Sequence, residues 1–180
     1  GDRGAFDTLV LRYENRVYNH CMRMIGDLEE SYDLAQEVFL KVFRNINNYQ
    51  HDYTFYTWLY RITVNCCIDH IRSRQRQGQN TSLSQSFAEE GDSGREMDIP
   101  DVTRVPENVA ASGQTSQIVQ EAIASMSEKL RTIIILKEVQ GHSYEEIADI
   151  LKCSRGTVKS RLFRARERLK ELLEPHMDSM

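Results

Sequence analysis

The sequence predicts an all-α protein made of two small helical domains joined by a flexible acidic linker. Apolar residues recur at helical spacing in the first and last thirds of the chain, and strand-type alternation is nearly absent. The segment 78–113 shows neither period and contains four glycines, two of the three prolines and many polar residues. So long a structureless stretch is uncommon inside one compact domain. We therefore predict domains at 1–77 and 114–180, with 78–113 as the linker.

The first domain is expected to hold helices at about 5–25, 29–46 and 55–75. The second of these has a core stripe of Leu34, Val38, Val42 and Ile46. Its opposite face gathers carboxylates and an amide around one leucine. That leucine is either an ordinary exposed residue or the centre of a protein-binding surface. The residues of this face are Asp33, Gln36, Glu37, Leu40 and Arg44.

The third helix follows an unusual concentration of aromatic residues, six of which lie within 49–60. Helical phase places Phe55, Ile62 and Cys66 with Leu59 on the core side, and Arg61, Asn65 and Arg72 on the opposite side. Rings interleaved with arginines are typical of surfaces that bind single-stranded nucleic acid. The alternative is that the rings fill a small three-helix core, which we expect for about half of them, Phe55 most clearly.

The second domain is expected to hold helices at about 115–125, 127–139, 143–151 and 154–173. Ser143 and Glu146 form a capping box at the start of the third, and Ser154 is the N-cap of the fourth. Two helices joined by so short a turn indicate a helix-turn-helix, whose second helix enters the DNA major groove.

The last helix separates an apolar stripe from a basic outward face. The stripe is Val158, Leu162, Ala165, Leu169 and Leu172. Residues 152–170 carry eight basic side chains, Arg155 among them, against only Glu167. Such a concentration of positive charge is typical of a surface that binds a polyanion such as DNA. The alternative is an ordinary helix face exposed to solvent. Phe163, amid Lys159, Ser160 and Arg164, would either contact a base or pack on a neighbouring loop.

Composition excludes several classes of protein. No run approaches the roughly 18 apolar residues of a membrane span, and we expect neither membrane insertion nor a signal peptide. The four cysteines form no CxxC pair, so we expect no zinc site and no disulfide framework. We predict a cytoplasmic protein without metal or cofactor.

Five segments together resemble the extracytoplasmic-function (ECF) sigma factors of bacteria, particularly the sigma-E-like branch of the sigma-70 family. Three lie in the first domain: GDRGAF at 1–6, DLAQEVF at 33–39, and FYTWLYRI at 55–62 followed by Asn65. Two lie in the second: GHSYEEIA at 141–148 and GTVKSRLFRAR at 156–166. Their order across an acidic linker is highly specific.

The resemblance implies an alternative sigma factor that binds core RNA polymerase, recognises promoters and helps open DNA, with no catalysis of its own. It implies that core RNA polymerase is contacted at the clamp and flap regions of its large subunit. The polymerase-binding residues it implies are Asp33, Gln36, Glu37 and Leu40, on the surface that docks on the clamp. Contacts to single-stranded −10 DNA fall on Tyr49, Trp58, Arg61, Asn65 and Arg72. Contacts to −35 duplex fall on Arg155, Lys159, Ser160, Phe163 and Arg164. It also implies an anti-sigma factor as partner, and a cytoplasmic, nucleoid-associated location.

Two other functions remain open from the residues. A response-regulator-like activator would share the helix-turn-helix but would not bind core polymerase as a sigma subunit. A nuclease or deaminase could use the aromatic cluster to hold its strand, although no HxE…CxxC motif or convergent set of carboxylates and histidines supports it.

Overall fold

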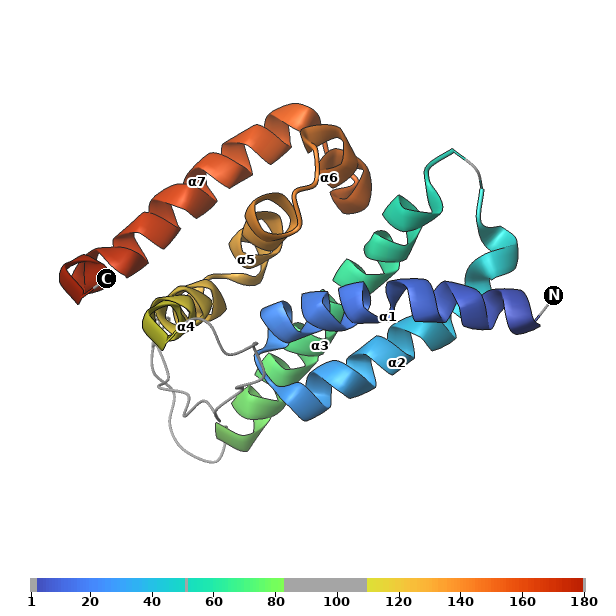
Figure 1. The fold of residues 1–180 in the computed structure, drawn as a ribbon, viewed down its shortest axis with the longest axis horizontal. Coiled ribbons are helices and arrows are strands. Elements are labelled where there is room, and N and C mark those ends of the chain that lie inside the picture. Colours follow the sequence, from blue (N-terminus) through green and yellow to red (C-terminus); the bar gives the residue numbers. More distant parts are fainter. Residues whose placement is uncertain (1–2, 51, 83–109, 180) are drawn as a thin grey trace.

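The computed structural model describes residues 3–50, 52–82 and 110–179, in which helices are joined by short turns and loops and no strand occurs (Figure 1). This confirms the all-α prediction. The N-terminal half comprises α1 (Arg3–Ile25), α2 (Leu28–Asn45), the short η1 (Ile46–Asn48) and α3 (Phe55–Ser82). The C-terminal half comprises α4 (Ala110–Ser125), α5 (Glu128–Ile134), η2 (Ile135–Val139), α6 (Tyr144–Leu151), α7 (Arg155–Leu173) and η3 (Glu174–Ser179).

Local chemistry sets the helix ends. Gly26 closes α1 at φ 82°, a left-handed conformation that glycine adopts without steric cost. Asp27 then caps α2 by accepting the Glu30 amide at 2.8 Å. Gly141, at φ 74°, similarly allows the chain to reverse before α6. The helix expected at 127–139 forms, but its second half is the π-helical η2.

The ends of the predicted linker differ from the expectation. α3 continues to Ser82 and α4 begins at Ala110, so both helices extend into 78–113. Residues 83–109 lie outside the described part of the chain, and the domain boundaries remain a prediction.

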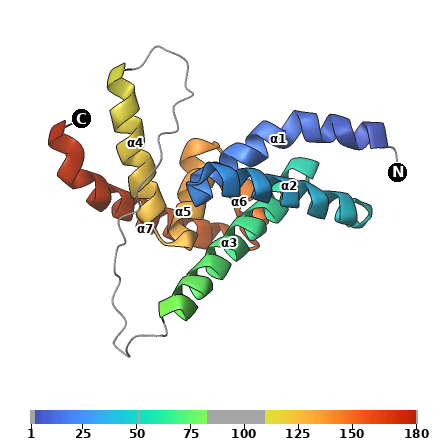
Figure 2. The ribbon, with the colours of Figure 1, turned by 90° about the horizontal axis from the view of Figure 1, so that it is seen from below.

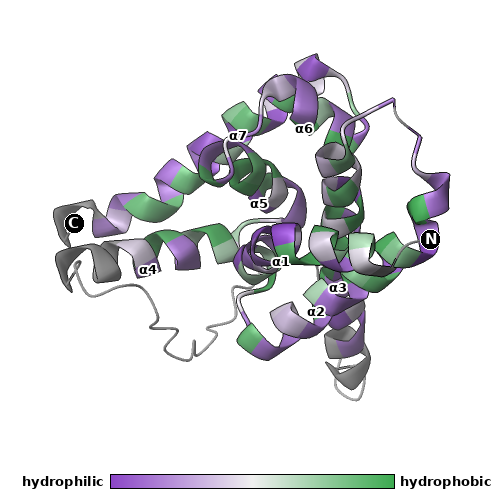
Figure 3. Ribbon diagram, turned by 45° about the vertical axis from the view of Figure 1, so that its right-hand side comes forward, coloured by the Kyte–Doolittle hydropathy of each residue, from purple (hydrophilic) through white to green (hydrophobic). Residues whose placement is uncertain are grey.

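The two halves pack against each other rather than standing apart. Their buried residues form one continuous cluster that runs from Val17, Val38 and Leu59 to Ile134 and Leu162. α1 and α3 contact α5, η2 and α6, and we call these contacts the domain seam. α4 and α7 lie side by side and project away from α1–α3 (Figures 2 and 3).

Arg131 of α5 ties the seam together. Its guanidinium donates to the Met24 oxygen at the end of α1, at 2.5 Å, and to the oxygens of Ala124 and Met126 at the end of α4. Helix ends leave carbonyls unsatisfied, so one half-buried arginine serves three carbonyls at two helix ends. Burial lowers the pKa of Arg131 from its ordinary value.

Hydrophobic and hydrophilic residues alternate along each helix of the described chain (Figure 3), and the buried positions are mostly apolar. Within residues 3–50, 52–82 and 110–179, no helix combines the length and the apolar character needed to cross a membrane.

Candidate nucleic-acid interfaces

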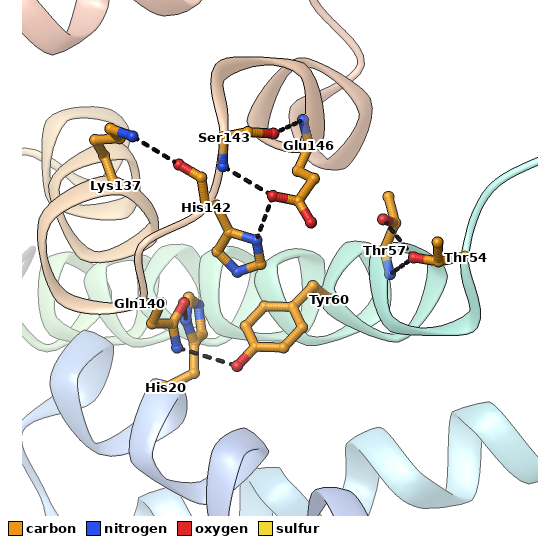
Figure 4. Close-up of polar contacts among 9 residues, drawn as sticks. All are labelled: His20, Thr54, Thr57, Tyr60, Lys137, Gln140, His142, Ser143 and Glu146. Atoms are coloured by element: carbon orange, nitrogen blue, oxygen red, sulfur yellow. Dashed lines mark hydrogen bonds and ion pairs between the residues drawn. The ribbon is translucent and has the colours of Figure 1, made fainter.

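The helix-turn-helix forms as the sequence predicts, with both N-caps in place. Glu146 N donates to Ser143 Oγ at 3.1 Å and Ser143 N donates to Glu146 Oε2 at 2.8 Å, completing the capping box (Figure 4). Ser154 Oγ accepts the Thr157 amide at 3.1 Å. Between the helices Lys152 adopts φ 50°, the left-handed C-cap geometry usually given to glycine.

The turn holds α7 with its apolar stripe inward. Val158, Leu162 and Ala165 are buried, while Leu169 and Leu172 pack at the edge of the core. The opposite face carries Lys159, Ser160, Phe163 and Arg164, all exposed as predicted. Phe163 is 67% exposed, so it does not pack on a loop of the described chain.

An open depression of about 480 Å³ lies where α7 begins. Tyr144, Glu145, Arg155, Gly156 and Lys159 line it. Arg155 Nη1 donates to Glu145 Oε1 at 2.7 Å, and this bond lowers the pKa of the glutamate. A Cβ at Gly156 would meet only Ser154 Oγ, at an ordinary 3.6 Å. No contact within the protein therefore requires glycine at this position. Its missing side chain leaves the start of α7 open to the backbone of a ligand.

A second cavity, of about 300 Å³, lies between α2 and α3. Asn65 is exposed at its edge and Trp58 is half-buried beside it. The other lining residues are Lys41, Asn45, Asn48, Ile62 and Cys66. An indole beside several amides can both stack on a base and hydrogen-bond its edge.

Lys41 and Asn45 are residues of this cavity that the sequence reasoning missed. Lys41 Nζ pairs with Glu37 at 2.8 Å and donates to Cys66 Sγ at 3.4 Å. The bond to Glu37 raises the pKa of Lys41. The sequence could have predicted both residues, because Glu37, Lys41 and Asn45 follow one another at i, i+4 spacing and therefore share one face of α2.

Tyr49 supports the cavity without lining it. Its ring lies 5.4 Å from that of Trp58 and 5.9 Å from that of Phe55, and its hydroxyl donates to the Tyr53 oxygen at 2.7 Å. These contacts hold the loop that follows η1 against α3. Tyr49 therefore holds Trp58 in position and does not itself line the cavity.

Arg61 and Arg72 lie on the same side of α3 as Asn65, but their guanidinium groups do not reach the cavity. Arg61 Nε donates to the Asp149 oxygen in α6 at 2.6 Å, and Arg72 pairs with Glu128 of α5 at 2.6 Å. Both thus contact the C-terminal half. Tyr60, part of the predicted aromatic cluster, is buried at 1% exposure in the seam.

The outer face of α2 is a separate surface. Asp33, Gln36, Glu37 and Leu40 are all exposed, with Leu40 at 54%. Phe43, one turn after Leu40, is 52% exposed and was missed by the sequence reasoning, although its i+3 spacing from Leu40 would have found it. Two large apolar side chains bordered by carboxylates suit a protein partner. In the described part of the chain, no three His, Cys, Asp or Glu side chains converge in a possible metal site.

Comparison with known proteins shows which family the chain belongs to. Residues 9–77 match the family Sigma-70 region 2, and residues 116–169 match Sigma-70, region 4. The chain is 38% identical over 178 residues to the RNA polymerase sigma-H factor of Pseudomonas aeruginosa, covering 97% of this chain and 89% of that protein. It is 39% identical over 177 residues to the ECF RNA polymerase sigma-E factor of Escherichia coli, covering 97% and 90%. The chain belongs to the ECF sigma factors of the sigma-70 family.

The fold of this ECF sigma factor agrees with solved structures. It matches the sigma factor RpoE of Bartonella quintana, crystallised with the anti-sigma factor NepR, at a TM-score of 0.72 and 25% identity, covering 94% of this chain and 97% of that one. CnrH, solved with the cytosolic domain of CnrY, shares the fold at a TM-score of 0.66 and 23% identity, covering 97% and 91%.

The protein is thus an alternative sigma factor, which directs promoter recognition and transcription initiation. Membership in this family decides against the response-regulator-like activator. Sigma factors are DNA-binding regulators, so the family gives no support to the strand-processing enzyme.

Proposed function

We propose that this ECF sigma factor reads its promoter with two surfaces, one in each half of the chain. The outward face of α7, built by Arg155, Lys159, Ser160, Phe163 and Arg164, contacts the −35 duplex. The cavity between α2 and α3 accepts a base of the opened −10 strand. No catalytic step belongs to the chain itself, and it works in the cytoplasm on the nucleoid.

The exposed Asn65 at the edge of the cavity carries this proposal. A structural asparagine would be buried with its amide bonded to backbone, whereas Asn65 points from the polar side of α3 beside Trp58. An amide offers two donors and an acceptor, enough to read the Watson–Crick edge of an extruded base. Tyr49 holds Trp58 in place, and Arg61 and Arg72 would follow the sugar–phosphate backbone.

The exposed face of α2 is the surface proposed for the large subunit of core polymerase. Leu40 is its apolar centre, and Asp33, Gln36 and Glu37 are its polar border. The flap of the same subunit is the proposed contact of the second domain. Because the related Bartonella sigma factor was crystallised with an anti-sigma factor, we include such a protein among the partners.

The deciding experiment compares Asn65→Ala with Asn19→Ala, an exposed asparagine of α1 that lies outside every proposed surface. Promoter opening is followed with core polymerase by the fluorescence of 2-aminopurine placed in the −10 element. Asn65→Ala should bind core polymerase and −35 DNA normally, yet lose opening and discrimination at one −10 base. The lost base contacts correspond to roughly 1–3 kcal/mol. Normal opening by Asn65→Ala would reject the cavity as the base site, and a loss of its thermal stability would make Asn65 a structural residue.

A further inference from the structure

One carboxylate borders the basic outward face of α7. Glu145, in the first turn of α6, accepts a hydrogen bond from Arg155 Nη1 at 2.7 Å, and the two side chains are 61% and 67% exposed. Ion pairs as exposed as this one contribute little to folding, because water solvates both charges and ordering two long side chains costs entropy. The stability of the fold therefore does not account for this pair.

The backbone holds both partners in fixed places. Glu145 lies between Ser143 and Glu146, the two members of the capping box, which fix the first turn of α6. Arg155 is the first residue of α7 and directly follows Ser154, whose side chain caps that helix. The carboxylate and the guanidinium thus project from two helix starts that are both capped.

The pair borders the open depression of about 480 Å³ at the start of α7. Lys159 lies one turn after Arg155, and Glu145 approaches both of them from α6. The hydrogen bond from Arg155 lowers the pKa of Glu145, and the charge of Lys159 adds to this effect, so the carboxylate is ionised at neutral pH. Gly156 lines the same depression and adds no side chain to it. The depression is therefore open between one acceptor and two cations.

The bond to Glu145 occupies only part of the Arg155 guanidinium. Nη1 is the donor, while the edge formed by Nε and Nη2 has no acceptor in the described chain. Two neighbouring N–H groups of an arginine match O6 and N7 of guanine in the major groove, which is the commonest base-specific contact. A guanidinium held at one nitrogen keeps one orientation, so it loses less side-chain freedom when it binds a base.

The other basic residues of the proposed −35 face have no such support. Lys159 and Arg164 are exposed, and neither makes a hydrogen bond or an ion pair within residues 3–50, 52–82 and 110–179. Long unsupported cations follow phosphates of any sequence, whereas a base edge requires a fixed direction. Arg155 is thus the cation of this face that the protein itself orients.

We propose that Glu145 is a positioning residue for −35 recognition, which directs Arg155 to a guanine at one base pair. The inference rests on the proposed function, because it takes the outward face of α7 to lie in the major groove of the −35 duplex. Glu145 contacts no base in this arrangement and acts only through Arg155. Its loss should therefore remove a preference at one position and leave the rest of the element recognised.

The test compares Glu145→Gln with Glu171→Gln in the full-length protein bound to core polymerase. Glu171 pairs with Arg168 at 3.0 Å near the other end of α7, and both side chains are exposed, so the control loses the same charge far from the depression. Arg155→Ala, the double variant Glu145→Gln/Arg155→Ala and Phe163→Ala complete the set. Circular dichroism confirms equal helicity in all of them.

Duplexes bound by each protein are recovered from a pool of randomised DNA and sequenced, which gives the base preference at every position. Arg155→Ala should lose the guanine preference at one base pair of the −35 element. Glu145→Gln should weaken that same preference at least about fivefold, while Glu171→Gln keeps it. In the Arg155→Ala background, Glu145→Gln should change no preference, because two residues that act through one contact are not additive.

The alternatives give different results. Tighter binding of Glu145→Gln to all sequences alike, with every preference kept, shows that the carboxylate only reduces the charge of the face and overturns the proposal. A change that persists without Arg155 shows that Glu145 contacts DNA itself and also overturns it. Altered preferences in Phe163→Ala beside unchanged ones in Arg155→Ala or Glu145→Gln contradict this inference alone. Unchanged preferences in Phe163→Ala and Arg155→Ala together reject the outward face as the reader, and with it the proposed function.

Discussion

His142, in the turn before α6, stacks on Tyr56 of α3, with ring centroids 5.3 Å apart and ring planes inclined by 21°. The same histidine meets Tyr60 edge-on at 4.9 Å, and Tyr60 in turn meets His20 of α1 at 5.6 Å. Two histidines from different domains thus lie in one buried aromatic cluster. A charged imidazolium is poorly solvated there, which makes the seam sensitive to pH.

Mild acid is expected to destabilise the closed fold through His20. Burial lowers the pKa of His20 to about 4, with an opposing effect of the Gln140 hydrogen bond and a further lowering by His142. His20 Nε2 has no hydrogen-bond partner in the described chain. The unfolded chain takes up the proton near pH 6.5, so stability is complete above that pH and declines towards pH 4, by on the order of 3 kcal/mol.

Urea unfolding between pH 7.5 and 4.5, an interval chosen to span the ordinary histidine pKa, measures this decline. His20→Gln should flatten it, whereas substitution of the exposed His176 should not. Burial also lowers the pKa of His142, although Glu146 opposes the shift and Lys137 adds to it, so part of the decline persists in the variant. An NMR titration of His20 with an ordinary pKa would contradict the assignment.

Lys152→Gly is expected to stabilise the protein. Lys152 holds φ 50° at the C-cap of α6, a conformation that costs a side-chain-bearing residue about 1–2 kcal/mol and glycine almost nothing. The greater freedom of glycine in the unfolded chain offsets part of this, leaving a gain of about 0.5–1 kcal/mol. Thermal unfolding measures it. Lys170→Gly, inside α7, should instead cost about 1 kcal/mol, and a loss of stability in both would reject the explanation.

Lys159→Ala and Phe163→Ala should weaken −35 binding in different ways. If Lys159 neutralises a phosphate, its loss should reduce the slope of log affinity against log salt by about 0.9. Phe163 offers only apolar contact, so its loss should lower affinity for the −35 element with the slope unchanged. Anisotropy titrations of a −35 duplex over a range of salt concentrations distinguish the two. Identical slopes in wild type and Lys159→Ala would exclude Lys159 as an electrostatic contact.

Leu40→Asp tests the proposed polymerase surface more specifically than a charge reversal at Glu37 would. Glu37 also pairs with Lys41 at the cavity, so charge reversal at Glu37 would disturb two proposed sites at once. Leu40 is 54% exposed. A carboxylate buried at the centre of an interface should cost about 2 kcal/mol or more, roughly a 30-fold loss of core-polymerase affinity. Leu11→Asp, at a 69% exposed leucine of α1, is the control, and equal affinities in the two variants would move the docking face elsewhere.

The helices, their order and the outward face of α7 follow from the sequence because each depends on local periodicity. Ser143, Glu146 and Ser154 specify their caps within three residues of themselves, and the stripe from Val158 to Ala165 fixes which side of α7 turns inward. Asn65 and Leu40 were assigned to exposed faces for the same reason, and both are exposed.

Only the tertiary structure decided what lies opposite those faces. Helical phase placed Arg61 and Arg72 away from the core of their own domain, but their partners are 88 and 56 residues distant in the sequence. The burial of His20 and Tyr60 likewise depends on Gln140 and His142 arriving from the other domain. The periodicity of a helix shows which of its sides is polar. The acceptor that contacts this side depends on how the two domains pack, and no local sequence pattern encodes that packing.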